Sequence, residues 1–270
     1  MLIKLYAVVA VLAETLICLF TDIIDSWTDF WIPIVMALGI FLALVTVTLL
    51  ILVIISWFVD KDKPCEKPEP FFKRTVEIVV DSVLFVAGVN TMMVGLEKVP
   101  TDRRFLLVCN HRCGLDPLPV IVKMRRYNVA FVSKPENFNL PIVGAFIHKS
   151  CCLPIDRENA RKAMKTIHKA TEYVKNDITS IGIYPEGTRS KTGELLEFKD
   201  GVFYIAKKAK CPIVVMTAEN TDKIGKNFPL RRTKVIYTVL GVVEPESFEN
   251  QSTHEISENV RNMMLAHLGK

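Results

Sequence analysis

The chain has 270 residues, of which 50% are hydrophobic and 23% are charged, and its formal net charge is +5. This length allows one sizeable α/β core with an appendage. The hydrophobic fraction is high for a soluble enzyme with that many charges, which excludes an even distribution of apolar residues along the chain. They are concentrated near the N-terminus.

Two apolar segments near the N-terminus predict a pair of membrane helices. Residues 30–59 carry no charge, and they exceed the roughly 20 apolar residues that a helix needs to cross a bilayer. Residues 2–20 are also apolar but contain Lys4 and Glu14, so this segment either spans the membrane or lies at its surface. A cleaved signal peptide does not fit, because Glu14 interrupts the apolar run. Residues 1–60 therefore predict a transmembrane helical hairpin.

The charges that flank these segments predict their orientation. Residues 21–29 hold three aspartates and no lysine or arginine, whereas five basic residues follow the second segment within residues 61–74. Because basic flanks stay in the cytoplasm, residues 61–270 are expected to face the cytoplasm from the cytoplasmic membrane. Residues 1–60 carry a net charge of −4 and the remainder +9, a basic balance that suits either anionic lipid headgroups or nucleic acid, and the membrane helices favour lipid. The seven cysteines are then expected to be free thiols.

The second part of the chain, residues 61–270, predicts an α/β domain that begins with a linker rich in charge and proline. Residues 71–88 have helical spacing and either pack on the core or rest on the bilayer. Short apolar runs predict strands at residues 105–109, 129–133, 180–184, 212–216 and 234–243. Helices are expected at residues 158–175 and 198–209 and after the capping pair Ser252 and Glu255. Strands that are apolar throughout indicate a central, mostly parallel sheet with helices on both faces.

The segment CNHRCGLDP, residues 109–117, places polar groups directly after a predicted strand, where α/β folds hold their active sites. His111 and Asp116 can pair only if a tight turn joins them, and Gly114 and Pro117 are suited to such a turn. The carboxylate would then keep one ring nitrogen of the imidazole protonated and leave the other free as a base. This pattern alone is also compatible with an unrelated histidine and aspartate.

A second polar segment, YPEGTRS at residues 184–190, follows another predicted strand. Its glycine turn, at Gly187, would bring backbone N–H groups together with Thr188 and Arg189, a combination that suits a phosphomonoester. Glu186 is expected to orient the arginine. Three further basic residues are candidates for the same anion site, namely Lys134, Lys149 and Arg157.

The order of NHRCGLD, PIDR, YPEGTRS and CPIVVM is similar to the four motif blocks of the 1-acylglycerol-3-phosphate acyltransferases, in the glycerophospholipid acyltransferase superfamily. The resemblance covers roughly residues 85–245. It implies that His111 deprotonates the acceptor hydroxyl, that Asp116 orients His111, and that Thr188, Arg189 and Arg157 hold the acceptor phosphate.

The same resemblance implies the reaction. A fatty acyl group would pass from an acyl-CoA or acyl carrier protein thioester to the sn-2 hydroxyl of lysophosphatidate, giving phosphatidic acid for phospholipid biosynthesis. No metal or cofactor would take part. Glycerol 3-phosphate or another lysophospholipid would present similar oxygens to the site, so these remain alternative acceptors.

Three other functions are compatible with these residues. A metal site would use a set drawn from Cys109, His111, Cys113, Asp116, Cys151 and Cys152, although the spacing is unlike that of common zinc sites. Cys113 beside His111 would alternatively act as a nucleophile and form an acyl-enzyme. A membrane-tethered binder of anionic lipid headgroups would need neither His111 nor Cys113.

Overall fold

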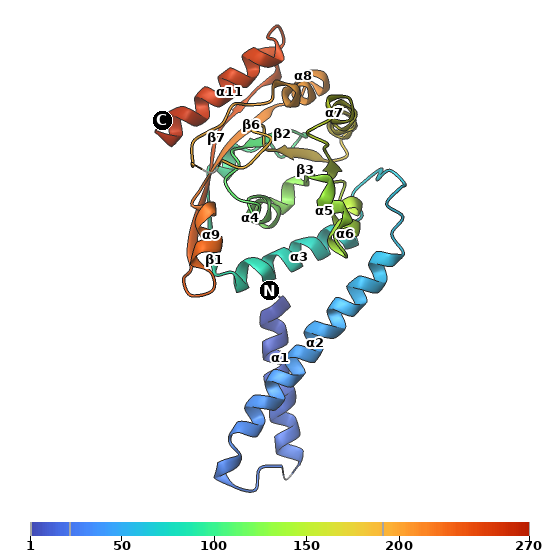
Figure 1. Cartoon of the computed structure of the whole chain (residues 1–270), viewed down its shortest axis with the longest axis vertical. Helices are drawn as coiled ribbons and strands as arrows, with labels where there is room; N and C mark the ends of the chain where they lie inside the picture. The colour runs from blue at the N-terminus through green and yellow to red at the C-terminus, as the bar shows by residue number, and fades with distance from the viewer. Residues whose placement is uncertain (1, 22, 191, 270) are drawn as a thin grey trace. The chain divides into compact units, whose positions relative to one another are not determined.

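The computed structural model describes residues 2–21, 23–190 and 192–269, and it divides into two compact units at Asp60 and Lys61 (Figure 1). The first unit contains helices α1 (Leu2–Phe20) and α2 (Trp31–Trp57), which lie against each other. Tyr6 and Thr48 join the two helices through a hydroxyl–hydroxyl contact of 2.6 Å.

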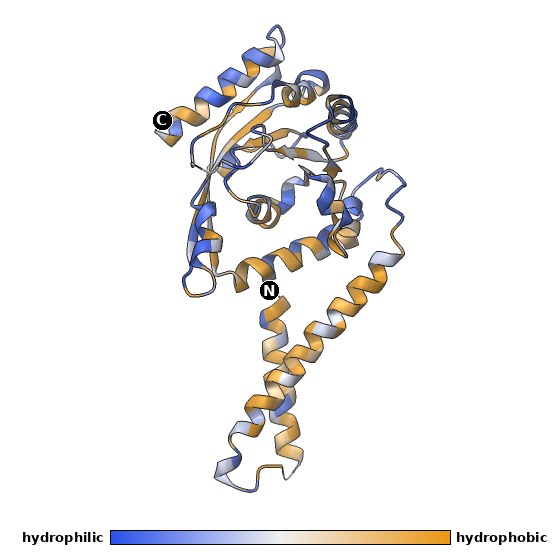
Figure 2. Ribbon diagram, in the orientation of Figure 1, coloured by the Kyte–Doolittle hydropathy of each residue, from blue (hydrophilic) through white to orange (hydrophobic). Residues whose placement is uncertain are grey.

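The surfaces of α1 and α2 are almost entirely apolar (Figure 2). Both helices are long and apolar enough to cross a membrane. Leucine, valine and phenylalanine side chains cover their outer faces, a composition that indicates membrane association. The side of the membrane on which the second unit lies stays a prediction.

The second unit is built around a seven-stranded sheet with the strand order β1-β7-β6-β2-β5-β3-β4. The strands are β1 (Val89–Val94), β2 (Leu106–Cys109), β3 (Val129–Ser133), β4 (Leu153–Pro154), β5 (Ser180–Ile183), β6 (Ile213–Glu219) and β7 (Thr233–Val243). Only the β6–β7 pair is antiparallel, and the other neighbours are parallel. The predicted α/β fold with a mostly parallel sheet is confirmed.

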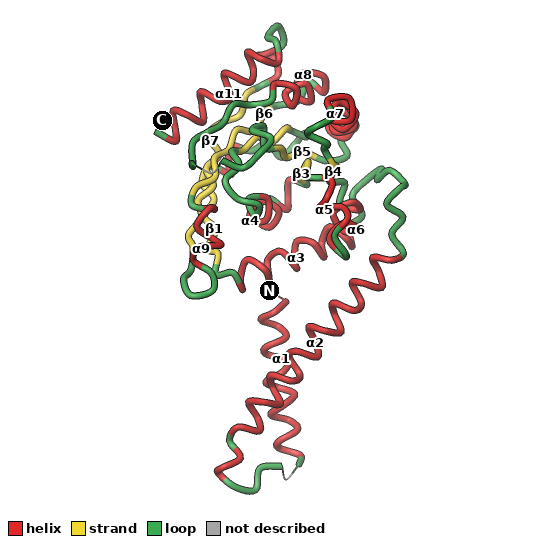
Figure 3. The backbone as a smooth tube through the Cα atoms, in the orientation of Figure 1, coloured by secondary structure: helices red, strands yellow, loops and turns green. Residues whose placement is uncertain are grey.

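Helices cover both faces of this sheet, as Figure 3 shows. They are α3 (Pro70–Val86), α4 (Pro117–Lys123), α5 (Pro135–Asn139), α6 (Val143–Lys149), α7 (Ala160–Lys175), α8 (Tyr204–Ala209), α9 (Ile224–Asn227), α10 (Pro245–Phe248) and α11 (Thr253–Leu268). The central strand β2 contributes Leu106 and Val108 to one hydrophobic core and Leu107 and Cys109 to the other. Its residues are apolar throughout because each face of the strand is buried.

The structure contains elements that the sequence did not predict, among them strands β1 and β4. The side chains of β1 are alternately exposed and partly buried, and β4 has only two residues. Neither strand therefore has the continuous apolar run by which the inner strands were predicted. The helix expected at residues 198–209 is divided into a 3-10 turn (Asp200–Phe203) and α8. The capping pair is present at α11, where the Ser252 hydroxyl accepts the Glu255 N–H and the Glu255 carboxylate accepts the Ser252 N–H.

Candidate active site

The loop that follows β2 is fixed by a buried asparagine. The Asn110 side-chain amide donates to the Ala218 carbonyl of β6 at 3.1 Å, and its oxygen accepts the Ala218 N–H at 2.7 Å. These two bonds satisfy both ends of the amide and imitate one more step of the β2–β6 pairing. The next residue, His111, therefore leaves the sheet from a fixed starting point.

His111 and Asp116 are brought together by the turn between them. The His111 Nδ1 and Asp116 Oδ2 atoms are 2.7 Å apart, and the same oxygen accepts the backbone N–H groups of Arg112 at 2.7 Å and Cys113 at 2.9 Å. The Asp116 side chain is 0% exposed and that of His111 is 12% exposed. An ionised carboxylate can only accept, so Nδ1 carries the proton and Nε2 is free to take another from a substrate.

Two tyrosines that the sequence did not indicate as site residues contact the His111–Asp116 pair. The Tyr184 ring stacks on the His111 imidazole with the ring centres 4.4 Å apart, and the Tyr237 hydroxyl donates to the Asp116 carbonyl at 2.9 Å. Burial raises the pKa of both phenols well above the usual range, so both stay neutral. Tyr184 begins the YPEGTRS segment, but Tyr237 lies inside β7, where the sequence offers no signal of a role in the site.

Replacing Tyr237 by phenylalanine should lower turnover by up to about tenfold, since one hydrogen bond is worth roughly 0.5–1.5 kcal/mol and Asp116 would be held less firmly. The acceptor KM should be unchanged because Tyr237 is fully buried and does not line the cavity beside the site. Steady-state kinetics would measure both constants. Tyr127→Phe is a matched control, because it removes a phenol–carbonyl bond of 2.9 Å to Leu96 away from the His–Asp pair.

Glu186 makes two backbone contacts that the sequence did not predict. Its carboxylate accepts the His111 N–H at 2.5 Å and the Leu196 N–H at 3.0 Å, and the residue is only 3% exposed. Its predicted roles, in binding substrate or orienting Arg189, stay predictions. Burial raises the pKa of this carboxyl, and the two backbone bonds oppose that effect. Glu186 joins the loop after β5 to the loop that carries His111.

Thr188 and Arg189 are exposed at the mouth of the site. Arg189 lies against the His111–Asp116 turn, since its Nη1 atom is 3.6 Å from the position that a Cβ on Gly114 would take. Gly187 adopts a left-handed conformation with a φ of 69°, which lets the chain turn before these two residues. The guanidinium thus lies beside the turn that carries the imidazole, and the binding role of Arg189 stays a prediction.

A cavity of about 380 Å³ opens beside this loop. Arg157, Thr188 and Lys199 contribute polar groups to its lining, and Ala163 and Met164 of α7 contribute apolar ones. Burial lowers the pKa of the Arg157 guanidinium, and the positive charge of Arg189 lowers it further. Lys199 was not predicted as a site residue, because most lysines are exposed surface residues and nothing in the sequence around Lys199 distinguishes it from them.

The other two predicted cations do not line this cavity. The Lys149 ammonium is 2.6 Å from the Glu69 carboxylate, an ion pair at the end of α6, and its role in the anion site stays a prediction. Lys134 follows β3 and directly precedes α5. Its position at the carboxyl edge of the sheet is compatible with substrate binding, which stays a prediction.

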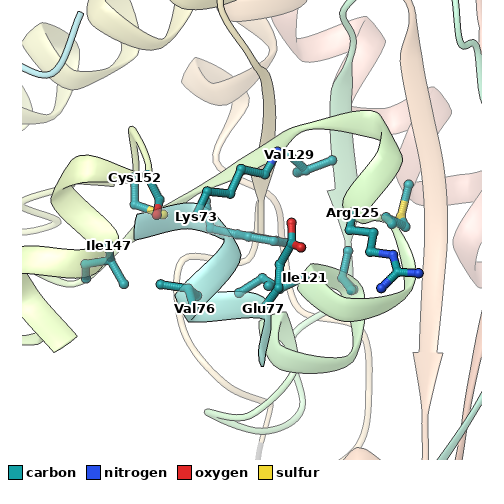
Figure 4. Close-up of a pocket in the computed structure, with 12 residues that line it drawn as sticks. Lys73, Val76, Glu77, Ile121, Arg125, Val129, Ile147 and Cys152 are labelled. Atoms are coloured by element: carbon teal, nitrogen blue, oxygen red, sulfur yellow. The ribbon is translucent and has the colours of Figure 1, made fainter. Parts of the chain in front are cut away.

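A smaller cavity, of about 40 Å³, lies between α3, α4, α6 and β3 (Figure 4). Lys73, Glu77 and Arg125 contribute its charged groups, and most of the other lining side chains are apolar. Phe131 also lines it and stacks on Tyr184 with ring centres 6.0 Å apart. Two aromatic rings therefore lie between this cavity and the imidazole of His111.

The structure also bears on the two alternative chemistries for this site, a bound metal ion and a cysteine nucleophile. Among residues 2–21, 23–190 and 192–269, no three histidine, cysteine, aspartate or glutamate side chains are grouped closely enough to hold a metal ion. Burial is the main cause that raises the pKa of Cys113, which disfavours the thiolate that a cysteine nucleophile requires. The imidazole–carboxylate pair is the better supported base.

A paired imidazole and carboxylate at the carboxyl end of a central strand, beside a cationic loop, form a site suited to general-base chemistry on an anionic substrate. The family model described as Acyltransferase matches residues 90–219, which include the His111–Asp116 turn and the loop of Arg189. These residues are therefore similar to the acyltransferase family.

Similar proteins agree with this assignment. The chain is 29% identical to the 1-acyl-sn-glycerol-3-phosphate acyltransferase of Saccharomyces cerevisiae, over 66% of this chain and 59% of that protein. It is 31% identical to a putative 1-acyl-sn-glycerol-3-phosphate acyltransferase of Caenorhabditis elegans, over 66% of this chain and 64% of that protein. The chain thus spans less than two thirds of the length of these relatives.

A solved structure also resembles this one. The crystal structure of the 1-acyl-sn-glycerophosphate acyltransferase PlsC from Thermotoga maritima aligns with a TM-score of 0.59 and 25% sequence identity. The alignment covers 73% of this chain and 79% of that chain.

Proposed function

We propose that the protein transfers a fatty acyl group from an acyl thioester to the sn-2 hydroxyl of 1-acyl-sn-glycerol 3-phosphate, giving phosphatidic acid. The observation that supports this most directly is the 2.7 Å contact between His111 and Asp116 beside the exposed guanidinium of Arg189. A base and an anion-binding group on one surface suit an acceptor that carries both a hydroxyl and a phosphate. The similar proteins named above carry the same activity in their names.

In the proposed reaction, Nε2 of His111 removes the proton of the acceptor hydroxyl while its oxygen attacks the thioester carbonyl. Asp116 stabilises the imidazolium that forms, because its oxygen already holds Nδ1. The tetrahedral intermediate then expels the thiolate, which takes the proton back from His111. The products are an oxygen ester and a free thiol, so the reaction needs no metal and no cofactor beyond the thioester itself, whether coenzyme A or acyl carrier protein supplies it.

The cavity of about 380 Å³ is suited to the acceptor. Its polar side, with Arg157, Thr188 and Lys199, would receive the phosphate, and the side chains of α7 would contact the acyl chain. The two apolar helices would insert in the cytoplasmic membrane, and the sequence flanking them favours a catalytic unit on its cytoplasmic side. An acceptor that already resides in the bilayer would then need no aqueous transfer.

The first experiment is acyl transfer from a labelled long-chain acyl-CoA or acyl carrier protein thioester to lysophosphatidate in vesicles. Labelled phosphatidate from the wild type, and little from His111→Ala, is expected. A panel with glycerol 3-phosphate and other lysophospholipids distinguishes the acceptors. A folded wild-type protein that binds lysophosphatidate but transfers no acyl group from either thioester would instead indicate a non-catalytic lipid binder.

Replacing Arg189 by alanine should raise the acceptor KM by about 10- to 100-fold with little change in turnover, because a charge-assisted hydrogen bond contributes roughly 1.5–3 kcal/mol. Initial rates over a range of lysophosphatidate concentrations would separate the two constants. Arg103→Ala is the matched control, since Arg103 is an exposed arginine whose partner is Glu244. An Arg189 variant with unchanged KM would exclude the guanidinium from phosphate binding.

Replacing Ala163 by phenylalanine should narrow the apolar side of the cavity. The kcat/KM for an acceptor with a 16-carbon chain should fall about tenfold relative to one with a 6-carbon chain, since crowding of a few methylenes costs on the order of 1–3 kcal/mol. Competition between the two acceptors would measure the ratio. Lys165→Phe, on an exposed position of the same helix outside the cavity lining, should leave it unchanged.

A further inference from the structure

The turn between α9 and β7 exposes two large apolar side chains. Phe228 is 49% exposed and Leu230 is 92% exposed. The turn is closed by the Phe228 N–H, which donates to the Ile224 carbonyl at 3.1 Å, and by the Arg231 N–H, which donates to the Asn227 carbonyl at 2.8 Å. These bonds hold residues 227–231 in a compact shape, so the exposure is a property of a formed turn.

The end of α3 lies beside this turn (Figure 1). The Thr233 N–H donates to the Gly88 carbonyl at 2.9 Å, and a Cβ on Gly88 would be 3.5 Å from the Arg232 Cα. Phe85 and Val86, in the last turn of α3, are about half exposed. Four exposed apolar side chains from two segments far apart in the sequence therefore lie at one end of the second unit, where Figure 2 shows apolar residues at the end of α3.

The exposed side chains of Phe85, Val86, Phe228 and Leu230 form an apolar tip. The chain around this apolar tip is strongly basic. Residues 223–234 contain five cations and no aspartate or glutamate; the cations are Lys223, Lys226, Arg231, Arg232 and Lys234. All five are exposed. Single exposed apolar residues are ordinary, but a protruding apolar tip ringed by one sign of charge is a feature of surfaces that enter an anionic lipid interface.

We propose that residues 223–234, with Phe85 and Val86, form a docking surface for an anionic phospholipid bilayer, in which Phe228 and Leu230 enter the acyl boundary and the five cations contact lipid phosphates. A bilayer fits better than a protein partner because the apolar residues project from a turn rather than line a groove. The same chain carries two apolar helices, α1 and α2, that indicate membrane association. The docking surface would add a second membrane contact, made by the catalytic unit itself.

Tryptophan fluorescence tests this surface, because all three tryptophans, Trp27, Trp31 and Trp57, lie in the first unit. In the full chain with those three replaced by phenylalanine, Leu230→Trp gives a reporter at the tip and Glu258→Trp gives a matched one on an exposed position of α11. Each is reconstituted in vesicles of three parts phosphatidylcholine to one part phosphatidylglycerol, with or without brominated acyl chains. At least twofold quenching by bromine is expected at position 230 and little at position 258.

The substitutions Arg231→Glu and Arg232→Glu, made in the chain that carries Leu230→Trp, should reduce the quenching at position 230. The quenching should also be weaker in vesicles of phosphatidylcholine alone. Equal quenching at the two positions would overturn the proposal. So would a response at position 230 only to an added acidic acyl carrier protein, because the surface would then bind a protein. The unmodified chain offers a second measurement, in which amide hydrogen exchange of residues 226–232 should slow at least threefold in the anionic vesicles; unchanged exchange there would also count against membrane contact.

Discussion

Replacing His111 by alanine should lower turnover by about 100- to 10,000-fold, the usual contribution of a positioned general base. The acceptor KM should change little, because the proposed phosphate contacts lie on Arg189 and Arg157 rather than on the imidazole. The side chain is only 12% exposed and stacks on Tyr184, so its removal leaves a small cavity but no unpaired charge other than Asp116. Steady-state rates and a thermal melt of the same preparation would separate lost chemistry from lost folding.

Asp116→Asn provides a finer test of the pair. The amide oxygen can still accept the N–H groups of Arg112 and Cys113, but the negative charge that stabilises an imidazolium is gone. Turnover should therefore fall by a comparable factor while the fold persists. Cys113→Ser is the control for the competing chemistry. Loss of activity in Cys113→Ser, together with substantial activity in His111→Ala, would show that a thiol carries the acyl group instead.

The sequence predicts the inner part of the fold well, since buried parallel strands have a clear signature. Strand β2 is apolar at every position because two cores meet across it, and such a run is easily recognised. Strand β1 lies at the edge of the sheet with alternate residues exposed, and it contains Asn90 and Thr91, so its signal is weak. The two-residue β4 is too short to produce any pattern.

The candidate site likewise contains some residues that the sequence predicts and others that it does not. His111 and Asp116 could be paired from sequence because five residues and a turn connect them. Tyr237 reaches Asp116 from a strand 121 positions away, and the neighbourhood of Lys199 and Gly187 depends on how a loop folds back. The ion pair between Lys149 and Glu69 could not be predicted for the same reason, since the two residues are 80 positions apart and only the tertiary structure brings them together.

Glu186→Leu should both destabilise the protein and reduce turnover. The carboxylate accepts the N–H groups of His111 and Leu196, and leucine would leave both donors without this acceptor in a buried site. Each such donor costs about 1–3 kcal/mol, and relief of the carboxylate's burial offsets part of the sum, so a net loss of about 2–4 kcal/mol in the free energy of unfolding is expected. At about 2–4 °C per kcal/mol, the Tm should fall by about 4–16 °C.

Glu186→Gln distinguishes the backbone role from a catalytic one. Glutamine keeps one oxygen that can accept an N–H but replaces the other by a donor, which cannot pair with a second N–H. Its Tm and turnover should therefore lie between those of the wild type and Glu186→Leu, and the two losses should change together across the series. Glu258→Leu, at an exposed position, controls for the loss of charge. If Glu186→Gln retained the full Tm but lost turnover as completely as His111→Ala, Glu186 would act directly on substrate rather than through the position of His111.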